Sequence, residues 1–303
     1  MGELLENFKI GLVLSGGGAK GAYESGVIKT LWELELINNI NVISGTSVGS
    51  VNALLLSMND RNVMSKSWNS LSYSRFINNE GQNRNIQIQN IIKKIKNINL
   101  ENSIVKQLLV NDIGILSQDG IKDFIEEYVD INVIKSSKRD IFACAYNIDK
   151  ERPEYFNLNQ HNHDEILNIV LASCAIPYIF KPIVIDGCRY ADGGINSPEY
   201  SKNNVDNVPI NPLINYECDL IIVVHLSNKN TIDKNKFKKD NIIEIYPSKP
   251  IEFISGTGGL MINKNKLRDN VELGYRDSMT ILAPIILNIV RGKNLDELLK
   301  NRK

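Results

Sequence analysis

The feature that most constrains the fold is a pair of short apolar segments near the N-terminus, each followed by glycines and then by a helical pattern. Residues 8–15 form the first apolar segment, and residues 20–36 carry apolar side chains at helical spacing. The same order of features recurs at 40–44 and 48–58. Two strand–turn–helix units so close together are typical of an α/β fold with a mostly parallel central sheet flanked by helices.

The remainder of the chain adds strands and helices after one change in character. Residues 60–118 are rich in Asn, Lys, Ile and Ser and show no clear strand, so we expect a helical insertion or lid there. Asp186 and Gly187 lie between two short alternating runs and predict a hairpin turn. Further strands are predicted at 139–148, 152–158, 218–227 and 240–247, and helices at 121–128, 165–173 and from Met279 onward. No repeat or low-complexity linker divides the chain, so one domain is expected over residues 1–303.

Composition excludes some classes of function. Lys plus Arg and Asp plus Glu number 35 each, so bulk charge gives no argument for a nucleic-acid partner. No apolar run approaches the roughly 18 residues that a membrane helix needs, and the N-terminus does not resemble a secretory signal. We therefore expect a cytoplasmic protein, with peripheral contact at a membrane surface left open. The sequence does not indicate an oligomeric state.

The four cysteines are not arranged for metal binding. No CxxC pair is present, and reduced, mostly buried thiols are expected at Cys144, Cys174, Cys188 and Cys218.

The glycines at 16–21, GGGAKG, formally satisfy the G-x-G-x-x-G pattern of a dinucleotide site, between a strand and a helix. That site also expects an acidic residue about 20 positions further on, at the end of the next strand. The next strand instead ends in Ser44-Gly45-Thr46-Ser47. A P-loop would need lysine directly after Gly21, where this chain has Ala22. A nucleotide-binding protein and a purely structural turn remain as alternatives.

A second loop favours a different chemistry. Residues 45–49, GTSVG, form a G-x-S-x-G pattern between a strand and a helix, the context of a nucleophile elbow. Adjacent parallel strands deliver their C-terminal loops to the same edge of a sheet. The amides of Gly16, Gly17 and Gly18 are then expected to face Ser47 as donors to a developing oxyanion, a role worth about 3–4 kcal/mol per donor.

A serine nucleophile needs a group that takes its proton. His161 and His163 lie in a polar turn, where solvated side chains are expected, and His225 ends a buried strand at the same sheet edge as Ser47. The order Ser47, Asp192, His225 matches the triad order of α/β-hydrolases. A histidine that ends a buried strand is more often a hydrogen-bonded structural residue, and both readings stay open.

Taken together, the motifs GGGAKG, GTSVG, ASCAIP (172–177) and DGG (192–194) resemble the patatin-like phospholipase family. The resemblance spans roughly residues 8–276 and does not extend to any motif within 60–118. It implies a three-layer fold and a serine lipid acyl hydrolase that needs no metal or other cofactor. The implied catalytic residues are Ser47 as nucleophile and Asp192 as its partner, and the implied oxyanion hole is formed around Gly16, Gly17 and Gly18.

The residues around Asp192 agree with this role. Asp192 follows the predicted hairpin strand and precedes two glycines, whereas Asp186 is expected to be a solvated turn residue. A solvated carboxylate, with a pKa of about 4, is a weak base. We therefore expect Asp192 to be partly desolvated and hydrogen-bonded to the Ser47 Oγ. A dyad without histidine suits esters better than amides, so the expected partners are lipid esters: phospholipids, lysophospholipids or acylglycerols.

Two cationic features have two readings each. Lys20 is positioned to attract a lipid phosphate or steady the glycine loop, or it is a solvated residue of the first helical turn. Residues 84–100 combine isoleucines with lysines, as in a helix that lies on an anionic membrane surface or in an ordinary exposed helix.

Overall fold

The computed structural model of the chain describes residues 7–71, 118–177, 180–195, 204–228, 241–251 and 264–293, together with positions 232, 295 and 298. Its strands are β1 (Ile10–Leu14), β2 (Ile40–Thr46), β3 (Asp140–Asn147), β4 (Arg152–Asn157), β5 (Ile183–Ile185), β6 (Cys188–Asp192), β7 (Leu220–Val224) and β8 (Ile242–Ile245). Its α-helices are α2 (Ala22–Glu33), α3 (Val48–Ser57), α4 (Arg61–Ser70), α7 (Asp119–Tyr128), α8 (Ile131–Ser136), α9 (His163–Ser173) and α10 (Lys264–Val290). Short 3₁₀ helices lie at Gly18–Gly21, Ile37–Asn39, Leu158–Gln160 and Asn211–Asn215.

The strands form one sheet in the order β5-β6-β3-β2-β1-β7-β8, with β4 also paired to β3. The run from β3 through β8 is parallel, and β4, β5 and β6 are antiparallel additions on the β3 side. This arrangement confirms the predicted α/β fold with a mostly parallel central sheet. The predicted hairpin is also confirmed, because Asp186 (φ 48°) and Gly187 (φ 77°) turn the chain between β5 and β6.

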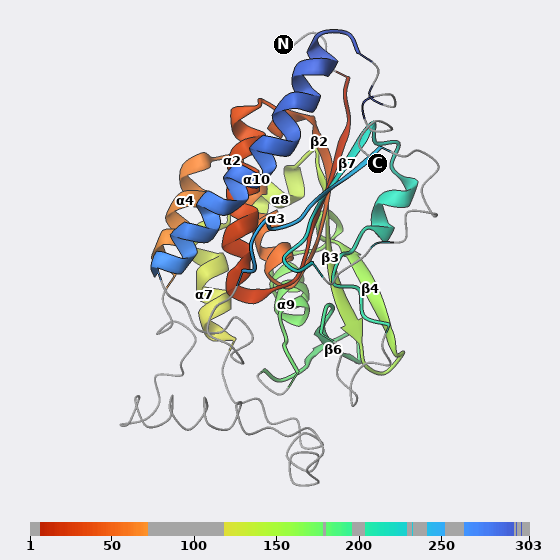
Figure 1. Cartoon of the computed structure of the whole chain (residues 1–303). Coiled ribbons are helices and arrows are strands. Elements are labelled where there is room, and N and C mark those ends of the chain that lie inside the picture. Colours follow the sequence, from red (N-terminus) through yellow and green to blue (C-terminus); the bar gives the residue numbers. More distant parts are fainter. Residues whose placement is uncertain are drawn as a thin grey trace.

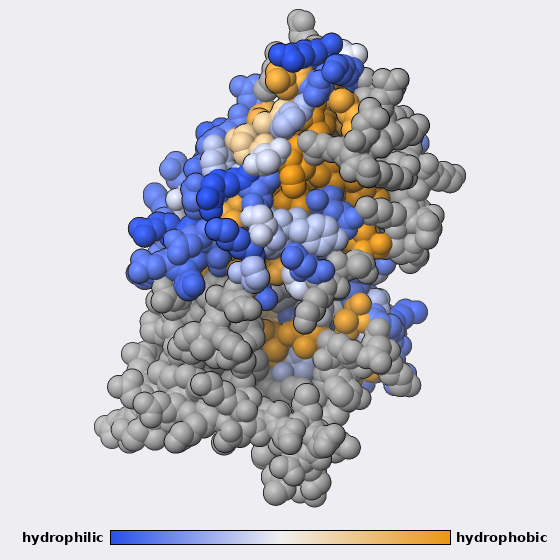
Figure 2. Space-filling model, viewed as in Figure 1, coloured by the Kyte–Doolittle hydropathy of each residue, from blue (hydrophilic) through white to orange (hydrophobic). Residues whose placement is uncertain are grey.

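The two faces of the sheet are covered differently. Along β1, Ile10, Leu12 and Leu14 belong to the large core beneath the helices, whereas Val13 faces a smaller cluster. In Figure 1, α2, α3, α4 and α10 gather on one side of the sheet. The smaller cluster is covered by the segment that carries the Asn211–Asn215 helix, through Val208, Ile210 and Leu213. In the same view, hydrophilic residues gather over α4 and the outer side of α10 (Figure 2).

Two segments differ from their predicted extents. The C-terminal helix begins at Lys264 rather than Met279, and Leu267, Asn270 and Leu273 in its first part are buried. The many charged residues between them weaken the apolar pattern, so the sequence did not predict this part as helix. The expected insertion at 60–118 begins with α4, whose Met64 and Trp68 are buried in the main core. Residues 72–117, and with them the predicted lid and the 84–100 helix, lie outside the described residues.

The register of the central strands places two loops side by side. Leu14 of β1 pairs with Gly45 of β2, so Gly16 and Ser47, each two residues further along, leave the sheet next to each other. On the other side of β2, Thr46 pairs with Cys144 of β3, and the next residue of β3, Ala145, pairs with Asp192 of β6. The glycine loop, the serine and the aspartate therefore converge at one edge of the sheet.

Candidate active site

Ser47 stands at a sharp turn between β2 and α3. Its backbone has φ 54° and ψ −125°, a conformation that a residue with a side chain adopts at a cost of order 1–3 kcal/mol. The turn also needs glycines on both sides: a Cβ at Gly45 would collide with the backbone of Gly49, and a Cβ at Gly49 would collide with the carbonyl of Leu14. This geometry is that of a nucleophile elbow, which holds a hydroxyl at the end of a strand.

A buried serine holds the elbow in place. The Ser173 Oγ accepts a hydrogen bond from the Ser47 N–H at 2.8 Å and donates to the carbonyl of Cys144 at 2.7 Å. Ser173 ends α9 and is fully buried. Ser173 is part of the ASCAIP motif, but no role for it was predicted from the sequence. Its contact partner lies 126 residues away in sequence, and no spacing rule reveals such a contact.

The glycine loop presents two adjacent backbone N–H groups at the site. Gly18 has φ 57°, in the left-handed region that favours glycine, and the Lys20 N–H closes the turn on the carbonyl of Gly17 at 3.2 Å. Within the part of the chain that the structure describes, the N–H groups of Gly17 and Gly18 have no hydrogen-bond acceptor. Two adjacent donors of this kind are suited to hold an anion or a polarised oxygen.

Asp192 is a buried carboxylate at the end of β6. It is 2% exposed, and its Oδ1 accepts a hydrogen bond from the Gly194 N–H at 2.9 Å. Burial raises the pKa of Asp192 from 3.8 to about 6, although the hydroxyl of Ser47 and the amide of Gly194 favour the charged form. The carboxylate is thus desolvated, as expected from the sequence.

The contact between Asp192 and Ser47 is looser than a regular hydrogen bond. The hydroxyl is near enough to lower the carboxyl pKa, yet the buried Asp192 Oδ2 has no partner of hydrogen-bond geometry among the described residues. Catalytic contacts in an enzyme without substrate are often long and tighten when substrate binds. The two side chains therefore approach each other in this structure, but the direct hydrogen bond expected between Asp192 and the Ser47 Oγ is not formed.

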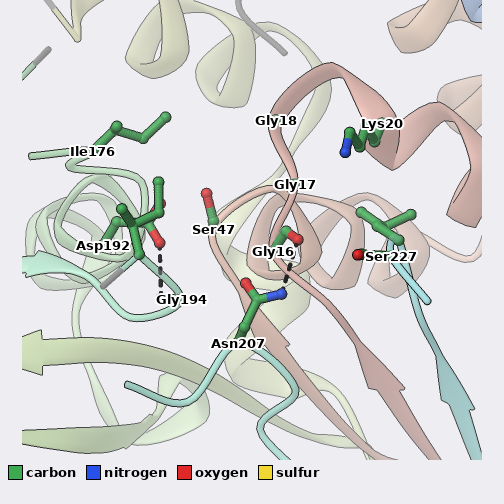
Figure 3. A pocket seen from close by; sticks show the side chains of 12 residues that line it. Gly16, Gly17, Gly18, Lys20, Ser47, Ile176, Asp192, Gly194, Asn207 and Ser227 are labelled. Carbon is green, nitrogen blue, oxygen red and sulfur yellow. Dashed lines mark hydrogen bonds between the residues drawn. The ribbon is translucent and has the colours of Figure 1, made fainter. Parts of the chain in front are cut away.

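All five predicted site residues line one cavity of about 200 Å³: Gly16, Gly17, Gly18, Ser47 and Asp192. Figure 3 shows the Ser47 side chain between Asp192 and the glycine loop. Lys20, half-buried, also lines the cavity. Other lining residues were not predicted from the sequence, among them Asn207 and the apolar side chains of Ile176, Ile195 and Leu226. A polar centre with apolar walls fits a ligand that carries a carbonyl group on a hydrocarbon chain.

The histidines lie away from this cavity. His225 is fully buried, its Nε2 is 2.9 Å from Glu244 Oε2, and its ring stacks on Tyr246 at 4.0 Å. It is absent from the described cavity lining, so the structure does not bring it together with Ser47 and Asp192. His161 and His163 are paired with neighbouring carboxylates of the same turn and helix and remain at least partly exposed. These placements agree with structural and solvated roles.

The cysteines are free thiols, with Cys144 and Cys174 buried and Cys188 and Cys218 half-buried. Burial and the nearby Asp192 carboxylate raise the pKa of Cys174, so its thiol stays protonated. Among the described residues, no group of histidine, cysteine or acidic side chains is arranged to hold a metal ion. No described helix is both long enough and apolar enough to cross a membrane.

Comparison with known proteins links this geometry to one family. A family model for patatin-like phospholipases matches residues 12–214. Probable lipid hydrolase 463L of Invertebrate iridescent virus 6 is 28% identical over 244 residues, which cover 77% of this chain and 68% of the viral protein. Triacylglycerol lipase 4 of Saccharomyces cerevisiae is 27% identical over 214 residues, which cover 67% of this chain and 22% of the yeast protein. The chain thus spans half or less of the length of some curated relatives.

A solved structure shares the fold. The crystal structure of VipD from Legionella pneumophila superposes with a TM-score of 0.54 at 18% sequence identity, over 92% of this chain and 67% of that one. At 18% identity this similarity shows a shared arrangement of the sheet and its helices, that is, the fold alone.

Proposed function

We propose, since this chain belongs to the patatin-like phospholipase family, that it is a serine hydrolase of lipid esters with Ser47 and Asp192 as its catalytic pair. The proposed substrates are phospholipids, lysophospholipids or acylglycerols. The proposal rests on one cavity that brings together a strained serine, a buried carboxylate and two backbone amides that have no acceptor among the described residues. Relatives named as a lipid hydrolase and a triacylglycerol lipase support the substrate class.

The proposed reaction has two halves. Asp192 accepts the proton of the Ser47 hydroxyl while the Oγ attacks the ester carbonyl, and the negative charge that forms on the carbonyl oxygen is stabilised by the amides of Gly17 and Gly18. The intermediate collapses, the ester bond breaks, and the alcohol leaves with the proton held by Asp192. Water then attacks the acyl group on Ser47 with Asp192 again as base, which releases a fatty acid and restores the serine.

The carboxylate limits the leaving groups that this site handles. A carboxylate whose conjugate acid has a pKa of about 6 is a modest base towards the serine hydroxyl, which favours the more reactive carbonyl of an ester. An amine leaving group must be protonated as it departs, whereas an alkoxide is a better leaving group and needs less help. The site is therefore expected to prefer esters over amides of the same acyl chain.

The pH profile of hydrolysis tests the role of Asp192. Only the ionised carboxylate accepts a proton, so we expect kcat/KM of the wild-type protein to rise with pH and reach half its plateau near pH 6, the raised pKa of Asp192. Initial rates on a dispersed phospholipid between about pH 4.5 and 8.5 measure this midpoint. A midpoint near pH 4 would indicate a solvated carboxylate and would contradict the proposed base.

A conservative change at His225 separates the dyad from a Ser–Asp–His triad. Because the His225 ring bonds to Glu244 and stacks on Tyr246 outside the cavity, we expect His225→Gln to lower kcat by less than about fivefold. Loss of a true triad histidine costs on the order of 10⁴-fold or more. Rates are compared below the melting temperature of the variant, which circular dichroism provides as the control for folding.

The substrate class is tested with a panel of lipid esters. Purified protein is incubated with a phospholipid, a lysophospholipid, a triacylglycerol and a fatty acid amide, and released fatty acid is measured. Release from at least one ester, with none from the amide, is the expected result. An inert panel combined with thermal stabilisation by NAD or ATP would favour a nucleotide-binding protein instead.

A further inference from the structure

The segment of residues 206–207 ties together the separate parts of the site. The Thr46 Oγ1 donates to the carbonyl of Asp206 at 2.8 Å, and the Asp206 N–H donates to the carbonyl of Gly193 at 2.8 Å. The Gly16 N–H donates to the carbonyl of Asn207 at 3.1 Å. One short segment thus contacts the chain before Ser47, the chain after Asp192 and the start of the glycine loop.

The side chain of Asn207 adds a contact of its own. Its Nδ2 donates to the carbonyl oxygen of Gly16 at 3.2 Å, as Figure 3 shows. The facing atom is a carbonyl oxygen, which only accepts, so the nitrogen of the amide must be the atom that faces it. The amide oxygen lies in the space where a side chain at Gly16 or Gly194 would otherwise stand. Asn207 therefore fills the gap between the glycine loop and the glycines that follow Asp192.

This contact fixes the direction of the neighbouring amide. In a trans peptide the carbonyl of one residue and the N–H of the next point in opposite directions across a rigid plane. Holding the Gly16 carbonyl towards Asn207 therefore turns the Gly17 N–H away from Asn207. That N–H is one of the two donors of the glycine loop that have no acceptor among the described residues.

We propose that Asn207 is a positioning residue that holds the Gly17 N–H in the orientation in which it donates to the oxyanion of the reaction. The inference rests on the proposed ester hydrolysis and adds to it the residue that keeps an oxyanion donor ready before substrate arrives. Preorganised donors stabilise developing charge because they need no reorientation during the reaction.

The segment is anchored independently of the Asn207 side chain. The carboxylate of Asp206 accepts hydrogen bonds from the Tyr155 hydroxyl at 2.5 Å and from the Asn211 Nδ2 at 3.1 Å. The bond from the Gly16 N–H goes to the backbone of Asn207 and does not depend on its side chain. A substitution at Asn207 is therefore expected to release the Gly16 carbonyl while the surrounding chain keeps its path.

The test compares Asn207→Asp and Asn207→Ala with the wild-type protein. Asn207→Asp keeps the size of the side chain and replaces its donor with an acceptor, whereas Asn207→Ala removes both. Asn204→Ala is the matched control, because Asn204 lies three residues before Asn207 and contacts Tyr146 and Glu151 outside the cavity. Each protein is assayed at the plateau of the pH profile with a chromogenic acyl ester and with its thionoester, in which sulfur replaces the carbonyl oxygen.

We expect both Asn207 variants to lower kcat for the oxygen ester by about tenfold or more, with KM changed less than about twofold. A sulfur anion is stabilised less by N–H donors, so kcat for the thionoester should fall less than kcat for the oxygen ester. The ratio of kcat for the oxygen ester to kcat for the thionoester should therefore fall at least about threefold. Asn204→Ala should keep the wild-type kcat and ratio. The melting temperatures of all variants are measured in parallel.

Three results would overturn the inference. Wild-type kcat and ratio in Asn207→Asp would show that the donor is not needed. An equal fall of both rates, with an unchanged ratio, would reduce Asn207 to a packing residue. A wild-type protein without ester hydrolysis would overturn the proposed function and this inference with it, an outcome distinct from the first two.

Discussion

Replacing Ser47 with alanine is expected to lower ester hydrolysis by at least about 10⁴-fold, because no other described hydroxyl or thiol is positioned by the elbow to form the acyl intermediate. The remaining contacts of the cavity with substrate are unchanged, so substrate binding should be retained. The measurement is released fatty acid over time, together with mass spectrometry of protein treated with a fluorophosphonate. The wild-type protein should gain one adduct on Ser47, and the variant should gain none.

Ser47→Gly supplies a matched control for this prediction. Both variants remove the nucleophile, but only glycine adopts φ 54° without strain. We expect Ser47→Gly to be as inactive as Ser47→Ala and more stable than it by about 1 kcal/mol in the free energy of unfolding. Substantial hydrolysis by either variant would mean that the reaction uses another nucleophile.

Replacing Asp192 with asparagine is expected to separate activity from stability. Asparagine has nearly the same shape and cannot take the serine proton, so hydrolysis should fall by about 10³-fold or more at every pH. The wild-type carboxylate, in contrast, destabilises the folded protein when it is charged, since burial raises its pKa to about 6.

The sign of this effect follows from proton binding. Between pH 3.8 and about 6 the folded state holds a proton on Asp192 more strongly than the unfolded chain does, so wild-type stability falls as pH rises through this window. The asparagine of the Asp192→Asn variant does not titrate. The free energy of unfolding of the variant minus that of the wild type should therefore grow by about 2–3 kcal/mol between about pH 4 and pH 7.

Urea unfolding at several pH values across this range measures the difference. A difference that stays constant with pH would mean that Asp192 is not desolvated. Wild-type activity in the Asp192→Asn variant would show that Asp192 takes no part in the mechanism. The control for the loss of a negative charge is Asp186→Asn, which changes an exposed carboxylate in the turn of the β5–β6 hairpin.

The parts of the site that the sequence predicted are those set by local pattern. Ser47 comes directly after β2 and Gly16 lies two residues after the end of β1, so strand–turn–helix spacing suffices to place both at one sheet edge. Asp192 was predicted from the residues around it and from the family resemblance. The structure places all three around one cavity, and their chemical roles remain proposals.

The unpredicted parts depend on contacts between distant segments. Ser173 reaches Ser47 across 126 residues, and Asn207 reaches Gly16 across 191. Neither contact produces a periodic pattern in the sequence, and the residue types give no hint either, because serine and asparagine are also common in solvated turns. The early start of α10 was missed for a related reason: residues 264–278 mix charges with few apolar residues, and their helical state depends on packing against α2.

The position of β7 bears on how the protein can be shortened for laboratory work. Similarity to the family model ends at residue 214, before β7, although β7 lies between β1 and β8 in the sheet. The later helix α10 crosses α2 so closely that neither Gly26 nor Gly274 has room for a Cβ. A polypeptide cut where the recognisable motifs end would leave one side of β1 without its hydrogen-bonded neighbour and strip the covering from α2. Such an open edge invites pairing with other chains. A fragment that keeps β1 paired on both sides therefore has to extend beyond residue 214 and include β7.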